Sequence, residues 1–132
     1  VQENNVTVEH YPGCPACKAM VNKIQIQQVL INMVRNSIEA IKNVKIPEGR
    51  VVLQTSLLPK GTIEVTVADN GPGIDAEIAD TIFYPFKTSK VMGMGIGLSL
   101  SRRIIESHGG RIWVDKEYQN GALLGFELPV ST

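Results

Sequence analysis

The chain of 132 residues has no surplus of either charge, because thirteen Lys and Arg residues balance thirteen Asp and Glu residues. It also has no dense run of like charges. A chain without a basic surplus has no long-range field that would attract nucleic acid or an anionic membrane. We therefore expect no nucleic-acid partner and no direct membrane contact, and a site for an anion has to be built locally.

Long apolar runs are also missing, since no stretch approaches the roughly 18 residues that a membrane-spanning helix needs. The first residues, Val-Gln-Glu-Asn-Asn, do not resemble a signal peptide. We therefore expect a cytoplasmic location, although the parent protein could be membrane-anchored. With 43% hydrophobic residues and no initial Met, the sequence is typical of one globular domain, residues 1–132, from a longer protein.

Cysteine is scarce, with Cys14 and Cys17 the two present. A pair at this spacing is compatible with a redox dithiol, or with half of a zinc site that another chain completes. No second pair exists to close a tetrahedral site within this chain. Because cytosolic disulfides are rare, we favour reduced thiols in a connecting loop, with redox and metal binding as the alternatives.

A predicted strand, residues 62–68, leads into the stretch Asp69-Asn-Gly-Pro-Gly-Ile-Asp75. Gly71 and Gly73 lack a Cβ atom, so the backbone can take positive φ and a flat ring can lie close against it. Asp69 would then stand at the edge of a pocket and accept a hydrogen bond from an amino group such as that of adenine. The alternative is a plain strand and turn with Asp75 as a helix N-cap.

Apolar residues recur at three-and-four spacing over residues 24–41, which predicts an amphipathic helix. Asn32 and Asn36, four residues apart, share one stripe of this helix. They are either solvated surface amides or a pair whose oxygens face a cation and phosphate groups, because magnesium prefers hard oxygen ligands.

A second glycine cluster, Gly93, Gly95 and Gly97, runs directly into a predicted helix at residues 96–107. Free amides at a helix N-terminus behind such a loop favour phosphate, whereas the alternative is a merely mobile loop. The cluster is no P-loop, since no Gly-Lys-Ser/Thr follows. It is no dinucleotide fingerprint either, because no strand immediately precedes it.

The remaining pattern predicts short elements. Strands are expected at residues 5–10, before a turn at 11–13, and at 18–21, while a short helix is expected at 76–81. Hairpins are expected from residues 50–57 with 62–68 and from 111–114 with 124–128. Phe83 and Phe86 are most simply packing residues, and their nearness to a glycine-rich segment also allows a hinge or docking role. His108 is expected to cap the end of the preceding helix.

Four motifs together resemble the asparagine, first glycine, phenylalanine and second glycine boxes of sensor histidine kinases. They are Asn32-Met-Val-Arg-Asn36, Asp69 to Asp75, Phe83-Tyr-Pro-Phe-Lys-Thr-Ser-Lys90, and Gly93-Met-Gly-Ile-Gly-Leu98 followed by His108-Gly-Gly110. Their order and spacing cover residues 23–128. The segment Gln25-Ile-Gln-Gln-Val-Leu and the short lid look most like the oxygen-sensing and nitrogen-regulatory branch.

The resemblance implies a two-layer α/β sandwich of the Bergerat type, with a mixed, mostly antiparallel sheet under about three helices and a mobile ATP lid. ATP and Mg²⁺ are the implied cofactors, with Asp69 on the adenine amino group and Asn36 on the metal beside Asn32. The implied base and phosphate contacts are Gly71, Gly73, Ile74, Phe83, Lys90, Gly93, Met94, Gly95, Ile96, Gly97 and Leu98. Glu39, where many relatives carry a lysine, departs from the family pattern.

The family also requires a phosphoacceptor histidine next to an acidic residue, and this chain has none: His10 precedes Tyr-Pro and His108 precedes Gly-Gly. The resemblance therefore implies the ATP-binding catalytic part of a two-component kinase. Its partners would be a dimerisation and histidine phosphotransfer domain and, downstream, a response regulator. The alternatives are an ATP-driven module of the gyrase, heat-shock chaperone or mismatch-repair kind, and a module that binds a non-nucleotide ligand.

Overall fold

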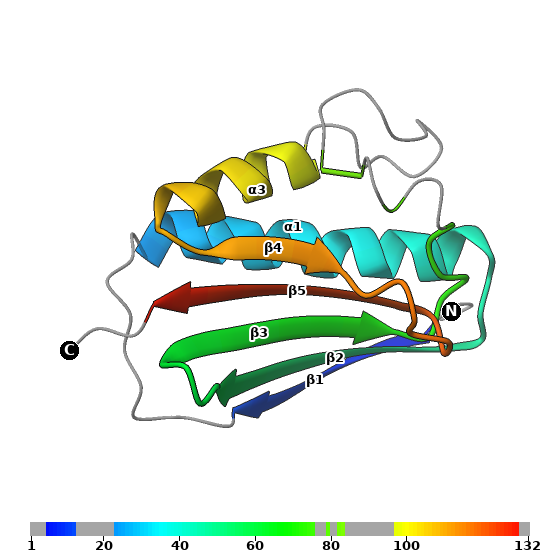
Figure 1. Ribbon diagram of the computed structural model, residues 1–132. Helices are drawn as coiled ribbons and strands as arrows, with labels where there is room; N and C mark the ends of the chain where they lie inside the picture. The colour runs from blue at the N-terminus through cyan, green and yellow to red at the C-terminus, as the bar shows by residue number, and fades with distance from the viewer. Residues whose placement is uncertain (1–4, 13–22, 76–78, 80–81, 84–96, 130–132) are drawn as a thin grey trace.

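The computed structural model describes residues 5–12, 23–75, 79, 82–83 and 97–129. In chain order its elements are β1 (Asn5–Pro12), α1 (Lys23–Asn43), β2 (Glu48–Leu57), β3 (Thr62–Asp69), α3 (Gly97–Ser107), β4 (Arg111–Val114) and β5 (Ala122–Pro129). Both described helices lie on one side of the sheet, where α1 contacts β2 and β3 while α3 contacts β4 and β5 (Figure 1). The expected two-layer α/β sandwich is confirmed.

The five strands form one sheet in the order β1-β2-β3-β5-β4. Only β1 runs parallel to its neighbour β2 in this sheet, and the other three pairings are antiparallel. The sheet is therefore mixed and mostly antiparallel, as expected. Its β2–β3 hairpin closes where the amide of Leu58 donates to the carbonyl of Thr62 over 2.8 Å.

The predicted turn at residues 11–13 is wrong for its first two residues, because β1 continues through Tyr11 and Pro12, which pair with Gln54 and Thr55. Among the described strands β1 lies at the edge of the sheet, and an edge strand tolerates proline because no amide donor is needed on its outer side. The strands β2 and β5 begin two residues earlier than predicted, at Glu48 and Ala122.

Two predicted elements fall mostly outside the described residues. The strand at 18–21 lies wholly outside them. Of the helix at 76–81 only Ala79 is described, and its amide donates to the carbonyl of Asp75 over 2.9 Å. Among the residues that are described, no helix is long and apolar enough to cross a bilayer.

The core lies between the two helices and the sheet, as the helical periodicity predicts. Val29, Met33 and Ile41 of α1 are fully buried, whereas its other predicted core residues pack partly buried at the margin. They meet residues from α3, the sheet and the segment after β3: Val51, Val67, Ile82, Leu98, Ile104, Ile105, Leu124, Phe126 and Leu128. Each such side chain contributes about 1.5–3 kcal/mol through burial.

The end of α3 is closed as predicted. The amide of Gly110 donates to the carbonyl of Ile105 over 3.0 Å, and Gly109 takes the left-handed conformation with φ of 80°. The Nδ1 atom of His108 lies 2.8 Å from the carbonyl oxygen of Ile104, so this ring caps the last turn. The turn at residues 109–110 then leads directly into β4.

Candidate functional site

Asp69 is the last residue of β3 and pairs with Val51 on one side and Ala122 on the other. Its side chain is buried, with the residue only 5% exposed. The Oδ1 atom accepts hydrogen bonds from the amides of Gly71 at 2.9 Å and Ala122 at 3.2 Å. Within the described residues Oδ2 has no hydrogen bond, so the carboxylate has a set orientation and one acceptor to spare.

Asn36 projects from α1 towards the same place. It is 6% exposed, and its Nδ2 atom is buried without a hydrogen-bond partner. An unpaired buried donor costs about 1–3 kcal/mol unless a ligand supplies the acceptor. The pairing of a spare acceptor on Asp69 with an unpaired donor on Asn36 therefore suits a ligand that carries both kinds of group.

Both side chains line one cavity, together with small and apolar neighbours from α1, the turn after β3, and β5. The lining residues are Asn36, Ser37, Ala40, Asp69, Gly73, Ile74, Ala122 and Leu124. The open space is about 10 Å³. A ring can enter only when this lining moves outward.

The glycines of the turn after β3 are required by close approaches of protein groups. A Cβ atom on Gly71 would lie 3.0 Å from Oδ1 of Asp69. Gly73 has φ of 86°, and a Cβ atom there would lie 3.1 Å from the carbonyl oxygen of Gly121. The sequence pointed to room for a ligand ring at these glycines, and the structure adds that the positive φ of Gly73 itself favours glycine in the turn.

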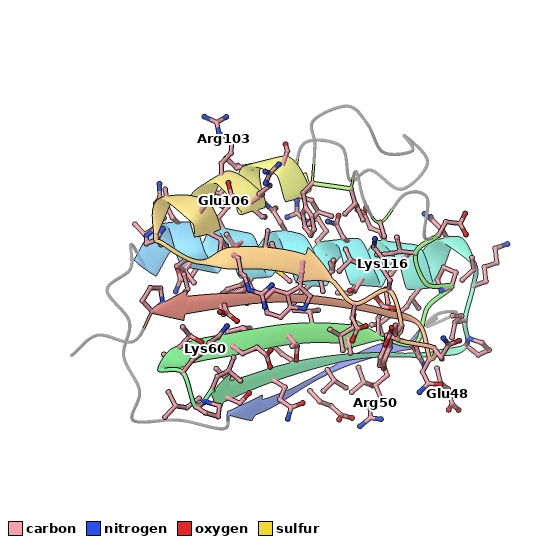
Figure 2. The ribbon with its side chains drawn as sticks, viewed as in Figure 1. Glu48, Arg50, Lys60, Arg103, Glu106 and Lys116 are labelled. Atoms are coloured by element: carbon pink, nitrogen blue, oxygen red, sulfur yellow. The ribbon has the colours of Figure 1, made fainter. Side chains whose placement is uncertain are left out.

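A larger cavity of about 850 Å³ adjoins the first and shares Gly73 and Ile74 with it. Its walls are the turn after β3 and the loop between β4 and β5, which contributes Lys116, Tyr118, Gln119, Asn120 and Gly121. Val44 and Ile82 complete the lining. Lys116 lies at this end of the molecule in Figure 2. The two cavities adjoin at Gly73 and Ile74, and we call them together the hollow at the end of β3.

Three residues around Asp69 were missed by sequence reasoning: Asn70, Gly121 and Ala122. The dipeptide Asn120-Gly121 is a turn signal that could have marked the loop. Gly121 has φ of 140°, and a Cβ atom there would collide with the carbonyl group of Asp69. No local pattern shows that the next amide, from Ala122, reaches the Asp69 carboxylate.

The other predicted site residues fall into three groups. Asn32 is half-buried one helical turn before Asn36. Phe83 packs partly buried against the core and Leu98 is fully buried in it, so both act at least as packing residues. Gly97 is the first residue of α3. Lys90, Gly93, Met94, Gly95 and Ile96, with the lid expected at 87–94, lie outside the described residues.

The described residues contain no group of three or more His, Cys, Asp or Glu side chains that could hold a metal ion. Asn36 offers one amide oxygen, which is a hard ligand of the kind that magnesium takes. A magnesium ion at this place would need further ligands from phosphate oxygens or water. The residues present therefore fit a metal that arrives with a nucleotide.

A family model described as histidine kinase-, DNA gyrase B- and HSP90-like ATPase matches residues 21–132. The sensor protein FixL of Bradyrhizobium diazoefficiens is 38% identical over 130 residues, covering 98% of this chain and 25% of FixL. Sporulation kinase D of Bacillus subtilis is 39% identical over 110 residues, covering 83% of this chain and 21% of the kinase. The chain thus spans a quarter or less of these relatives.

Solved structures agree with this assignment. The catalytic domain of histidine kinase ThkA superposes with a TM-score of 0.81 at 34% identity, covering 94% of this chain and 78% of that one. Full-length ShkA in complex with AMPPNP has a TM-score of 0.81 at 26% identity, covering 97% of this chain and 26% of ShkA. This chain belongs to the histidine kinase-, DNA gyrase B- and HSP90-like ATPase family, as an ATP-binding catalytic domain of the sensor histidine kinase type.

Proposed function

We propose that this chain binds Mg-ATP in the hollow at the end of β3 and positions the γ-phosphoryl group for transfer to a histidine on a separate domain. The observation that carries the proposal is the meeting of Asp69 and Asn36 in one cavity. Asp69 is a buried residue whose Oδ2 atom has no hydrogen bond within the described residues, and Asn36 has a buried donor without a partner. The relatives of the chain are named as a sensor protein, a sporulation kinase and a histidine kinase catalytic domain, which favours this reaction over a gyrase-type or chaperone-type ATPase.

At the base end, the Oδ2 atom of Asp69 would accept a hydrogen bond from the amino group of adenine. Because Oδ1 is already held by two backbone amides, the carboxylate does not have to reorient when the base arrives. Once the lining has moved outward, Ile74 and Leu124 would supply the apolar contact for the ring. The Asp69 carboxylate then loses little side-chain entropy on binding, because it is already held.

At the phosphate end, the amide oxygen of Asn36 would hold magnesium with Asn32 beside it. When bound, magnesium neutralises charge on the phosphate groups. We propose that Lys90 and the amides of residues 93–98 hold the phosphates, since α3 begins at Gly97 and a helix N-terminus presents free amides to an anion. Catalysis by this chain would then consist of positioning and charge stabilisation.

The phosphoacceptor would belong to a dimerisation and histidine phosphotransfer domain of the parent protein, with a response regulator acting downstream. His108 does not suit this role, because its ring already caps α3 through the carbonyl of Ile104 at 2.8 Å. Residues 1–132 would then form a single catalytic domain within a longer kinase. We expect this domain to act in the cytoplasm, where ATP is supplied.

Two measurements on the purified chain test this function. Calorimetric titration with Mg-ATP should show binding at a stoichiometry of one. After addition of the separately expressed dimerisation domain of the parent protein, labelled ATP should give an acid-labile phosphohistidine on that domain. Absence of nucleotide binding would overturn the whole proposal. Binding with rapid hydrolysis and no phosphohistidine would instead identify an ATPase.

A further inference from the structure

Asn70 makes three hydrogen bonds to the first residues of β2, although its side chain is exposed. Its Oδ1 atom accepts from the amide of Arg50 at 2.8 Å, and its Nδ2 atom donates to the carbonyl of Glu48 over 2.9 Å. Its own backbone amide donates to the carbonyl of Arg50 over 3.2 Å. Figure 2 shows Glu48 and Arg50 together at this end of the sheet.

These hydrogen bonds lie just beyond the end of the regular ladder between β2 and β3. The last paired residues of that ladder are Val51 and Asp69. Beyond them one backbone bond remains, from the amide of Asn70 to the carbonyl of Arg50, before the chain turns away through Gly71 and Gly73. The side-chain amide of Asn70 offers one acceptor and one donor, so it takes the place of a further rung and ties the start of the turn to β2.

Arg50, to which Asn70 is hydrogen-bonded on β2, also contacts β1 on the other side of that strand. The guanidinium group of Arg50 donates to both carboxylate oxygens of Glu9 on β1, with Nε at 3.1 Å and a terminal nitrogen at 2.7 Å. This ion pair is exposed and contributes little stability on its own. The Arg50 backbone is also part of the β1–β2 ladder, where Arg50 pairs with Thr7, and this pairing makes it a firm attachment for Asn70.

We propose that Asn70 is a positioning residue for nucleotide binding, which rests on the function proposed above. It holds the Asp69 carboxylate from the β2 side while Ala122 holds it from the β5 side. Without Asn70, the turn carrying the Gly71 amide is released at its first residue. The Oδ1 atom of Asp69 then loses a well-placed donor, and Oδ2 no longer keeps one direction towards the ligand.

The test compares Asn70→Ala and Asn70→Asp with wild type. Gln54→Ala is the control, since Gln54 is an exposed amide on the same β2 strand, away from the turn. Affinities for ADP and for Mg-ATP are measured by calorimetry, well below the melting temperature of each variant. Amide hydrogen exchange at Gly71 and Ala122 is measured by NMR without nucleotide.

Asn70→Ala should weaken ADP and Mg-ATP binding by the same factor, about threefold to tenfold, because both nucleotides share the base end. Asn70→Asp should fall between wild type and Asn70→Ala, since a carboxylate keeps the acceptor for Arg50 but lacks the donor for Glu48. Exchange at Gly71 and Ala122 should become faster in Asn70→Ala, while Gln54→Ala should match wild type.

Unchanged affinity in Asn70→Ala with a lower melting temperature would show a purely structural role and overturn the proposal. Weakening of Mg-ATP alone would place the effect at the phosphate end and overturn it too. If wild type itself bound no nucleotide, the proposed function would fail, whereas exchange at Gly71 and Ala122 would still decide whether Asn70 holds Asp69. Should Asn70→Ala not fold, Asn70→Asp carries the same comparison.

Discussion

The Oδ1 atom of Asp69 accepts a hydrogen bond from the backbone amide of Ala122, which lies 3.2 Å away and 53 residues further along the chain. The amide of Gly71 donates to the same oxygen from the other direction. The protein therefore holds one carboxylate oxygen, while Oδ2 has no hydrogen bond within the described residues. Such an arrangement lowers the cost of binding, because the acceptor is oriented in advance.

Replacing Asp69 with Asn tests this division of the two oxygens. The two backbone amides require an acceptor at the position of Oδ1, so the new NH₂ group would occupy the position of Oδ2. The N–H donors of this NH₂ group would then face the amino group of the adenine base, which is also a donor, so no hydrogen bond could form between them. We expect nucleotide affinity, measured by calorimetry, to fall about tenfold or more.

The control for this change is Glu64→Gln, which neutralises a carboxylate on the same strand away from the turn after β3. It should bind nucleotide as wild type does. Equal affinity in Asp69→Asn and wild type would remove Asp69 from the base pocket.

Replacing Asn36 with Ala should separate binding from stability. The amide loses its ligand contacts, so affinity for Mg-ATP should fall about tenfold or more. The protein without nucleotide loses no hydrogen bond from Nδ2, because that atom has no partner. We therefore expect its melting temperature, followed by circular dichroism, to move by less than about 4 °C.

Asn43→Ala is the matched control, since Asn43 is an exposed amide at the end of the same helix. A large loss of stability in Asn36→Ala with unchanged Mg-ATP affinity would mean that the amide serves the fold rather than a ligand.

Gly121→Ala should damage both the fold and the site. A Cβ atom there would press on the carbonyl group of Asp69 and approach Cα of Asn70 to 3.0 Å, in a backbone conformation that disfavours side chains. We expect the free energy of unfolding in urea to fall by more than about 1 kcal/mol, together with weaker nucleotide binding.

Gly61→Ala is the control for the loss of stability that comes from placing a side chain on a backbone with positive φ. Gly61 has φ of 89°, but a Cβ atom there would meet nothing within 4 Å. The loss of stability in Gly121→Ala beyond that in Gly61→Ala therefore measures the close approach to Asp69. Equal losses would argue against that contact.

The isolated chain should hydrolyse bound ATP slowly. Asn32 lies one turn before Asn36 on α1, where an attacking water would need a base, and an amide has no useful basicity. A positioned general base is worth about 10²–10⁴-fold in rate, so Asn32→Glu should raise phosphate release, measured in a steady-state assay. Asn32→Gln retains an amide and should leave the slow rate unchanged. Rapid turnover by wild type would contradict this prediction.

The parts of the fold that depend on local pattern could be predicted from the sequence. The three-and-four spacing around Val29 and Met33 predicted α1, because burial of one helical face follows from residues close in the chain. Alternation over residues 62–68 predicted that Asp69 ends a strand, and the glycine pair at 109–110 predicted the end of α3. The resemblance to sensor kinases then indicated which of these residues to compare with a nucleotide site.

The surroundings of Asp69 depend on contacts between residues distant in the sequence. Local alternation does not reveal that β5 lies between β3 and β4, so it could not bring Ala122 to the carboxylate. The role of Asn70 becomes visible only when the register of β2 against β3 places Arg50 beside it. By itself the sequence determined α1, α3 and the acid at the end of β3, because periodic burial is local. Only the tertiary structure decided how that acid is held, since sheet order and register set its partners.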